Sequence, residues 1–392
     1  MTVPSNDEQF LLELINDARL NPMLNASRYI ASYNPLVSSA SNIQDALNFF
    51  GVNGAALLSA YSALIPVQPI AFNANLGDAA LGHNNAMIAA DSQSHQLPGE
   101  PGLGARADNA GYTGWSSLGE NIYAYSEDVL YGHAGFMVDW GFGPDGMQTP
   151  PGHRQSIMSS GFREVGLSIV AENDPSTSVG QQVITQDFGT RFSGPAVLIL
   201  GVAYNDIDSN DFYSPGEGLG TLSVASANGG STTAAASGGY TLGLVAGATT
   251  LTYTGAGLPG AVTVSGTFTS GTNVKVDIVG GSVLLTSGSM SVSGPVSTIE
   301  ALGVVGLTLT SGATGHTVLG TDGGGDALLG GGGNDILRGL GGRDILAGGE
   351  NDDTLDGGTG DDVLDGGGGF DTISYAGSNA GVAINLTTGG AS

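Results

Sequence analysis

The sequence contains no cysteine, so neither disulfide bridges nor thiolate chemistry are available to this protein. Basic residues are scarce: nine Lys and Arg stand against 36 Asp and Glu, a formal net charge of -27. Nucleic acid is therefore excluded as an expected partner, because phosphate binding needs clustered Lys and Arg, and cations are favoured instead. No run of 18 apolar residues occurs, so no membrane span is expected. The first residues, MTVPSNDEQFLLELIND, lack the basic and continuous apolar regions of a signal peptide.

Glycine, by contrast, is abundant, with 68 among 392 residues, which indicates turns and repeats. A chain of this length exceeds one ordinary core, and its composition changes along its length. The predicted domains are 1–192, 195–280, 281–320 and 321–392. The first is expected to mix α and β, beginning with a helix behind a capping box of Ser5 and Glu8. The second has short alternating runs between glycine-rich turns, which predict a small β-sandwich, and the third is a β-rich approach to the last.

From residue 321 the sequence repeats every nine residues, with glycines leading each block. One aspartate recurs in the same frame, and a large aliphatic follows it two positions later. The aspartates are Asp326, Asp335, Asp344, Asp353, Asp362 and Asp371, and the aliphatics are Leu328, Leu337, Leu346, Leu355, Leu364 and Ile373. Glycine-rich turns let backbone carbonyls point inward, and carboxylates add hard oxygen ligands of the kind that Ca²⁺ prefers.

Stacked blocks of this kind predict a parallel β-helix, in which two blocks form one coil and the aliphatics fill a shared core. Aspartates should then pair at a separation of eighteen residues, as Asp326 with Asp344 and Asp335 with Asp353. Residues 321–374 hold twelve acidic residues against two arginines, a net charge of -10. Such a stack would repel itself without cations, so its folding is expected to depend on metal.

These blocks resemble the repeats-in-toxin (RTX) family, whose nonapeptide is GGxGxDxUx with U a large aliphatic. The resemblance implies a β-roll with Ca²⁺ bound in its turns, an extracellular location, and the type I secretion machinery as a partner for export from Gram-negative cells. The segment SYAGSNAGVAINLTTG looks like the family's usual continuation after the last repeat. Three turns depart from the pattern, at Leu340, at Asn351 and at Thr321-Asp322, and weaker ion sites are expected there.

A second cation site is predicted in VAYNDIDSNDFYSPGEG. Its oxygen-bearing side chains occupy positions 1, 3, 5, 9 and 12 of a Ca²⁺ loop, with a backbone carbonyl at position 7. These are Asp206, Asp208, Asn210, Ser214 and Glu217, with Phe212 at position 7. Asp211 replaces the usual glycine at position 6, where an Asp can adopt the left-handed conformation. The frame looks like loops of bacterial surface β-sandwich repeats, and a solvated acidic hairpin is the alternative.

In the first domain, SHQ, SLGENIYA, PPGHRQSIM and TQDFG together resemble the CAP superfamily (cysteine-rich secretory proteins, antigen 5 and pathogenesis-related 1). That family is an α-β-α sandwich with a cleft of two histidines and two acids. The matching positions are His95, Glu120, Asp139 and His153, with an Asp where the family has Glu. Such groups could bind Zn²⁺ and activate water, or form a structural hydrogen-bond network. His83, on the apolar face of a predicted helix, is expected in the core.

Three functions are compatible with these patterns. The favoured one is a secreted, calcium-stabilised protein whose repeats fold after export and whose CAP-like domain contacts an unidentified extracellular ligand. The second is an extracellular metal-dependent hydrolase that uses the four cleft residues, so whether the protein is an enzyme stays open. The third is an adhesin-like surface protein in which the β-sandwich is a spacer.

Overall fold

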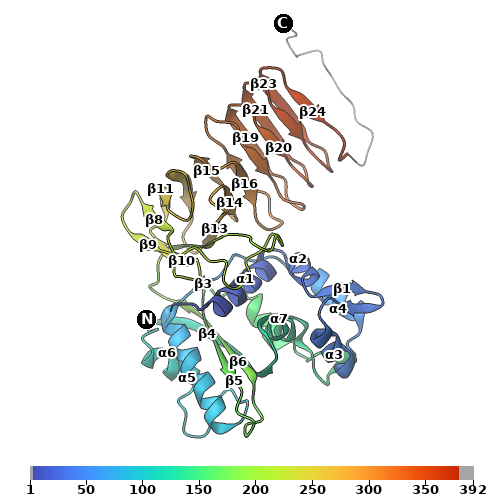
Figure 1. The fold of residues 1–392 in the computed structure, drawn as a ribbon, viewed down its shortest axis with the longest axis vertical. Helices are drawn as coiled ribbons and strands as arrows, with labels where there is room; N and C mark the ends of the chain where they lie inside the picture. The colour runs from blue at the N-terminus through green and yellow to red at the C-terminus, as the bar shows by residue number, and fades with distance from the viewer. Residues whose placement is uncertain (1–2, 379–392) are drawn as a thin grey trace.

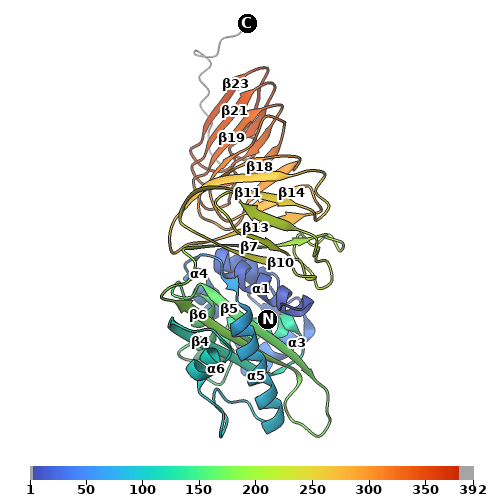
Figure 2. The same ribbon diagram turned by 90° about the vertical axis from the view of Figure 1, so that its left-hand side faces the viewer.

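The structure is a computed structural model that describes residues 3–378. A mixed helical and stranded domain lies at one end, and a region of strands alone extends from it (Figure 1). Along the long axis of the molecule, the strands follow one another away from the helices, and the last described strands lie farthest from them (Figure 2). Among residues 3–378, no helix is long and apolar enough to cross a membrane.

The N-terminal domain begins with the capping box that the sequence predicts. The Ser5 side chain accepts a hydrogen bond from the Glu8 N–H, and the Glu8 carboxylate accepts one from the Ser5 N–H. The helices and helical turns are α1 (Asn6–Leu20), α2 (Pro22–Ser27), α3 (Ser41–Phe50), α4 (Gly54–Ser62), α5 (Ala74–Ala90), α6 (Leu103–Asn109), α7 (Val129–Ala134), η1 (Gly135–Asp139), η2 (Pro144–Gly146) and α8 (Gly152–Ile157). The strands are β1 (Ile30–Tyr33), β2 (Leu36–Ser38), β3 (Ala71–Phe72), β4 (Trp115–Ser126), β5 (Glu164–Glu172) and β6 (Gln181–Arg191).

Helices cover both faces of a four-stranded sheet of order β3-β5-β6-β4. Helix α5 packs on one face, while α1, α7 and α8 pack on the other (Figure 1). Val165 and Phe188 of the sheet lie fully buried among α1 and α7 side chains, and Val183 lies with Met87 of α5. The α-β-α architecture that the CAP resemblance implies is confirmed.

The rest of the described chain forms two facing β-sheets. Their strands are β7 (Val197–Tyr204), β8 (Ser223–Ser226), β9 (Ser231–Thr233), β10 (Gly239–Leu244), β11 (Gly247–Thr254), β12 (Val262–Phe268), β13 (Asn273–Val279), β14 (Val283–Thr286), β15 (Met290–Ser293), β16 (Thr298–Ala301), β17 (Thr308–Thr310), β18 (Thr317–Leu319), β19 (Ala327–Gly332), β20 (Ile336–Arg338), β21 (Ile345–Glu350), β22 (Thr354–Asp356), β23 (Val363–Gly368) and β24 (Thr372–Ser374). One sheet has the order β10-β7-β13-β14-β16-β18-β20-β22-β24, and the other β23-β21-β19-β17-β15-β12-β11-β8-β9.

Both sheets run without a break from the sandwich into the coils. Pairing is mostly antiparallel up to β15 and parallel from there on. A single apolar core extends from Val197 at the start of the sandwich to Leu355 in the coils. The predicted sandwich and parallel β-helix are confirmed, and they share one core; the predicted domain limits remain a prediction.

From β15 and β16 onward the coils have two register lengths. The first parallel pairs, up to the first repeat strands, are separated by nineteen residues, as Thr308 is from Ala327. Within the nine-residue repeats the separation is eighteen, as for Ile345 with Val363, and this confirms two blocks per coil. The aliphatics Leu328, Leu337, Leu346 and Leu355 are fully buried, whereas Ile373, in the last coil that the structure describes, is 39% exposed.

A buried polar interface joins the N-terminal domain to the sandwich. The guanidinium of Arg163 donates to the carbonyl oxygens of Pro195 and Ala196, and the Asn273 amide donates to the carbonyls of Pro69 and Arg163. These bonds fix the start of β7 and β13 against the edge strand β3 of the first domain.

An ion cluster reinforces this interface. The Lys275 ammonium lies 2.8 Å from Glu13 Oε2 of α1 and also contacts the Asp277 carboxylate. All three side chains are at most 5% exposed. Burial alone would lower the pKa of Lys275, but the charges of Asp277 and Glu13 outweigh it and raise this pKa. The Lys275 ammonium therefore stays charged, and its contact with Glu13 joins α1 to the sandwich.

Candidate calcium sites and the histidine cleft

From Asp335 onward, each repeat aspartate is held in the same way, through its Oδ1 atom. Asp344 Oδ1 accepts the N–H of Asp326 at 2.8 Å, and Asp353 Oδ1 accepts that of Asp335 at 2.8 Å. Asp362 and Asp371 accept from Asp344 and Asp353 in the same manner. The structure thus brings together the pairs at a separation of eighteen that the sequence predicts.

The second oxygen of these aspartates is the informative one. Oδ2 of Asp335, Asp344 and Asp353 is buried and has no hydrogen-bond partner within residues 3–378. A side chain at Gly348 would meet the Gly366 carbonyl oxygen at 2.6 Å and Asp353 Oδ2 closer still. A carboxylate oxygen and a carbonyl oxygen of the next turn therefore face the same small space, which only glycine leaves open.

Buried, unpaired carboxylates are costly, and the charges of the column add to that cost. Burial raises the pKa of Asp344 to about 6, and the neighbouring charges of Asp326 and Asp362 act in the same direction. Burial likewise raises the pKa values of Asp335 and Asp353. Free oxygens of this kind, beside inward carbonyls, fit a hard divalent cation such as Ca²⁺.

The match to known families bears on these turns directly. The family model of the RTX calcium-binding nonapeptide repeat (4 copies) matches residues 320–355 and 339–373. Residues 320–373 are RTX calcium-binding repeats. No curated protein matches the chain.

The three departures from the RTX pattern have visible consequences. Leu340 and Asn351 adopt positive φ angles of 71° and 79°, a conformation that glycine accepts without strain. In the first turn, Thr321 donates from both its N–H and its hydroxyl to Asp326 Oδ2. The protein itself satisfies the oxygen that is free in the later RTX turns, so an ion is least needed at Asp326.

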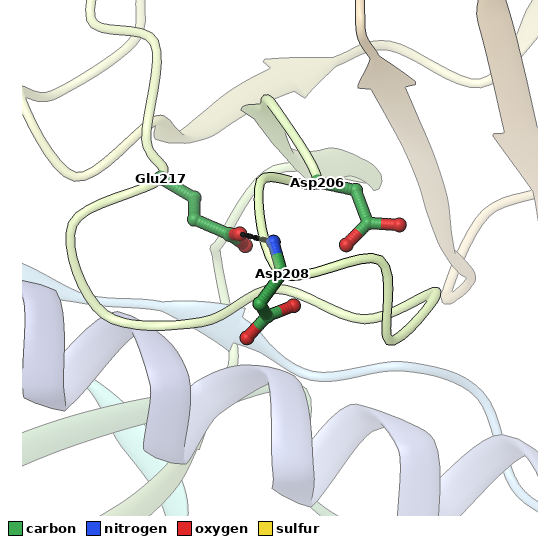
Figure 3. Close-up of side chains that lie close together, drawn as sticks. All are labelled: Asp206, Asp208 and Glu217. Carbon is green, nitrogen blue, oxygen red and sulfur yellow. Dashed lines mark hydrogen bonds between the residues drawn. The ribbon is translucent and has the colours of Figure 1, made fainter.

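The predicted loop in the sandwich does gather its acids. Asp206, Asp208 and Glu217 offer carboxylate oxygens that lie within 4.8 Å of one another, and they point toward a common space (Figure 3). Glu217 is 6% exposed and accepts N–H groups of Ile207 at 2.7 Å and Ser214 at 2.8 Å. Within residues 3–378, this is the one group of three or more such side chains that meets this distance.

The remaining loop positions support the same frame. The Asn210 amide and the Ser214 hydroxyl both donate to Asp208 Oδ2, at 3.0 and 2.8 Å. Asp211 has a φ of 57°, so it adopts the left-handed conformation that position 6 requires. Three mutually close carboxylates repel one another, and a divalent cation would relieve that repulsion. The three carboxylates could hold Ca²⁺, and Phe212 occupies position 7 of the loop.

The CAP-like cleft residues form two separate pairs rather than one cluster. His95 Nδ1 lies 2.9 Å from Glu120 Oε1, and His153 Nδ1 lies 2.8 Å from Asp139 Oδ1. No three of these four side chains meet the 4.8 Å criterion that the loop satisfies. The arrangement therefore gives no support to a zinc ion in the cleft.

Glu120 belongs to a buried network of charged side chains that the sequence did not predict. Burial would raise its pKa, but the hydrogen bond from His95 and the charge of Arg106 outweigh burial and lower it. His83 is fully buried, as expected, but it pairs with Glu100 at 2.7 Å instead of packing among apolar groups alone. Asp187 lies opposite Glu120 on the neighbouring strand. Burial, with the Glu120 charge, raises the pKa of Asp187 well above its usual value.

Asp139 holds the second pair in place. It ends the π-helical turn η1 with a φ of 58°, and its Oδ2 accepts the N–H groups of His153 and Arg154 at 3.0 and 3.3 Å. Its carboxylate is therefore fully occupied by the start of α8. His133 is fully buried and forms a hydrogen bond through Nε2 with Asn25 Oδ1 at 2.9 Å.

Two solved structures are similar to parts of the chain. One is an extracellular protein containing an SCP domain from Bacillus anthracis str. Ames, with 21% identity over 38% of this chain and a TM-score of 0.25. The chain spans 40% of the length of that protein. The other is an outer surface protein from Borrelia burgdorferi, with 8% identity over 40% of this chain and 96% of that one, and a TM-score of 0.26. Likeness at this level carries no information about function.

Proposed function

We propose that this protein is an extracellular calcium-binding protein whose RTX repeats fold on Ca²⁺ after export and whose CAP-like domain presents a ligand site. The observation that carries the proposal is the set of buried, unpaired Oδ2 atoms of Asp335, Asp344 and Asp353. In the absence of a cation, these oxygens are desolvated without compensation. Low cytosolic calcium keeps the repeats unfolded for passage through type I machinery, and higher calcium outside stabilises the folded coils.

The loop at residues 206–217 gives calcium a second role, at the junction with the CAP-like domain. Phe212 of this loop lies under the guanidinium of Arg28, at 3.6 Å from Cζ to the ring centre, and packs edge-on against Phe10 at 6.1 Å. Both partners belong to the first domain. A cation held by Asp206, Asp208 and Glu217 would therefore fix the surface on which α1 and the segment after α2 rest.

Hydrogen exchange of the full chain, with Ca²⁺ or with EGTA, tests the main proposal. We expect amides of β19–β24 to be protected in calcium and to exchange rapidly in EGTA, while α5 and β5 stay protected in both. Mg²⁺ at equal concentration is the control, because it favours a tight octahedral site and keeps its waters. Equal protection of the repeats in EGTA and in calcium would overturn the proposal.

The loop is tested separately with Glu217→Gln. This change removes a charged ligand while it keeps an oxygen that can accept the N–H of Ile207. We expect one fewer bound Ca²⁺ by calorimetry and faster exchange around Phe212, with the RTX coils unaffected. An unchanged stoichiometry would mean that the acidic loop is only a solvated hairpin.

The hydrolase hypothesis remains a prediction without a structural observation in its favour. His153→Ala is its direct test, with peptide and ester substrates screened against the calcium-loaded protein. Turnover by the parent chain that this change abolishes would establish catalysis at the Asp139–His153 pair.

A further inference from the structure

A cavity of the CAP-like domain lies beside the Asp139–His153 pair and differs from it in chemistry. It has a volume of about 520 Å³, within the roughly 300–1,000 Å³ range of small-molecule sites. It is open to solvent on one side and is lined by side chains of helix α4, of η2 with the segment after it, and of helix α8. Its wall is largely apolar, with Ala60, Leu64, Met147 and Met158 among the lining residues.

One charged group lines this cavity from a buried position. Arg154 is 4% exposed, and its Nε is buried with no hydrogen-bond partner among the described residues. The Nη2 group of Arg154 donates to the Val138 carbonyl oxygen at 3.3 Å and contacts the Met147 sulfur at 3.9 Å. The Tyr61 ring lies 5.5 Å from Cζ. These contacts leave most of the five N–H donors of the guanidinium without an acceptor.

Among residues 3–378, the arginines in ion pairs with carboxylates are Arg28, Arg106 and Arg191, and Arg154 is not among them. The nearest candidate in sequence, Asp139, is occupied by His153 Nδ1 and by the backbone N–H groups of His153 and Arg154. Asp145 also lines the cavity, but it is exposed to water. A buried cation without a counter-ion is costly, so the site favours an anion from outside the chain.

We propose that this cavity binds a small organic acid, with its carboxylate on the Arg154 guanidinium and its apolar part against the methionine and leucine side chains. The planar fork of a guanidinium matches a carboxylate better than a point charge does. Gln148 lines this cavity and also a smaller one of about 120 Å³, which His153, Phe136 and Trp140 line as well. The bound acid would therefore lie next to the Asp139–His153 pair.

This inference rests on the proposed ligand-binding role of the CAP-like domain and gives that role a chemical class. It does not depend on the RTX repeats, so calcium uptake by the full chain is measured on the same samples. A chain that takes up calcium but binds no acid refutes this inference alone.

The test is calorimetry of the full calcium-loaded chain with hexanoate, and with hexanamide as an uncharged probe of the same shape. We expect saturable binding of one hexanoate and binding of hexanamide at least about tenfold weaker, because charge-assisted bonds are much stronger than neutral ones. Equal binding of the two probes, or no saturable binding of hexanoate, would overturn the proposal. Inorganic phosphate that binds more tightly than hexanoate would overturn the carboxylate assignment.

Two variants locate the site. Arg154→Lys keeps the charge and loses the planar fork, and we expect hexanoate affinity to fall at least about tenfold. Arg154 is buried, so that variant is at risk of misfolding, and a second variant is needed. Ala60→Phe fills the cavity from α4 and leaves the Arg154 guanidinium intact. It should also abolish binding, while the fluorescence of Trp115 and Trp140 confirms that the domain is folded. Unchanged affinity in a folded Ala60→Phe protein would place the ligand elsewhere and refute the proposal.

Discussion

Replacement of Asp344 by asparagine should change stability in opposite directions with and without calcium. Asp344 is fully buried, its Oδ1 accepts the Asp326 N–H, and its Oδ2 has no partner among residues 3–378. The asparagine side chain would keep the first bond through its amide oxygen. It would also remove a buried charge and place an amide donor in the space that the Gly357 carbonyl oxygen borders.

The magnitude follows from the cost of an unpaired buried group, about 1–3 kcal/mol and more when it is charged. Three such oxygens in the repeats cost roughly 3–9 kcal/mol, comparable with the whole net stability of a domain. In EGTA, Asp344→Asn should therefore stabilise the repeats by about 1–3 kcal/mol. In calcium at 1,000 times the dissociation constant, loss of one site removes about 4.1 kcal/mol of calcium-induced stabilisation. Together with the gain of about 1–3 kcal/mol from the removed charge, the variant should be roughly 1–3 kcal/mol less stable than the parent chain in calcium.

Hydrogen exchange of β21–β24, in EGTA and in calcium, measures both stability changes on the same variant. Asp361→Asn is the matched control, because it makes the same charge change on an exposed neighbour in the same repeats. Both tryptophans, Trp115 and Trp140, lie in the CAP-like domain, so their fluorescence reports whether that domain is intact. If Asp344→Asn weakened the repeats equally in EGTA and in calcium, the unpaired oxygen would not be an ion ligand, and the reasoning would fail.

Four further changes probe other parts of the molecule. Leu346→Ala, at a fully buried position, should cost about 2–5 kcal/mol of unfolding free energy in calcium, whereas Leu329→Ala, at 38% exposure, should cost much less in the same denaturant assay. Leu340→Gly should raise stability by about 0.5–1 kcal/mol, because glycine accepts the positive φ of that turn. Lys275→Met should cost on the order of 3–5 kcal/mol and loosen α1 in hydrogen exchange, because two buried carboxylates lose their cation. Burial lowers the pKa of His133 to about 3, whereas an unfolded histidine has a pKa of about 6.5. Between these two pH values the unfolded state binds a proton and the native state does not. The contribution of neutral His133 to stability is therefore fully present above about pH 6.5 and is lost as the pH falls toward 3. Between pH 7.5 and 5.0 the parent chain should lose about 2 kcal/mol more than His133→Gln in urea unfolding, and parallel curves would contradict this assignment.

Local chemistry explains what the sequence could predict. The register of eighteen follows from the aspartate spacing alone, because Asp344 must meet the next coil wherever two nine-residue blocks complete a turn. The capping box at Ser5 and the left-handed Asp211 are equally local, since each depends on residues within a few positions.

Contacts between distant residues were beyond such reasoning. Nothing near Lys275 in the sequence indicates that it meets Glu13, 262 residues away, in a buried cluster. The register of nineteen around Thr308 was not predicted either, because the approach segment lacks the glycine and aspartate pattern. In the cleft, the sequence named His153 but not its neighbour Arg154, whose unpaired Nε is visible only in three dimensions.

The sandwich and the coils share two continuous sheets, and this arrangement gives the repeats a starting template. A free parallel coil must lose the entropy of its first turn before any neighbouring coil stabilises it. Here β15 and β16 already present ordered edges onto which β17 and β18 pair. Ion uptake would then advance from the coil nearest the sandwich outward, one turn after another, so that the order in which calcium is gained is set by the geometry of the chain.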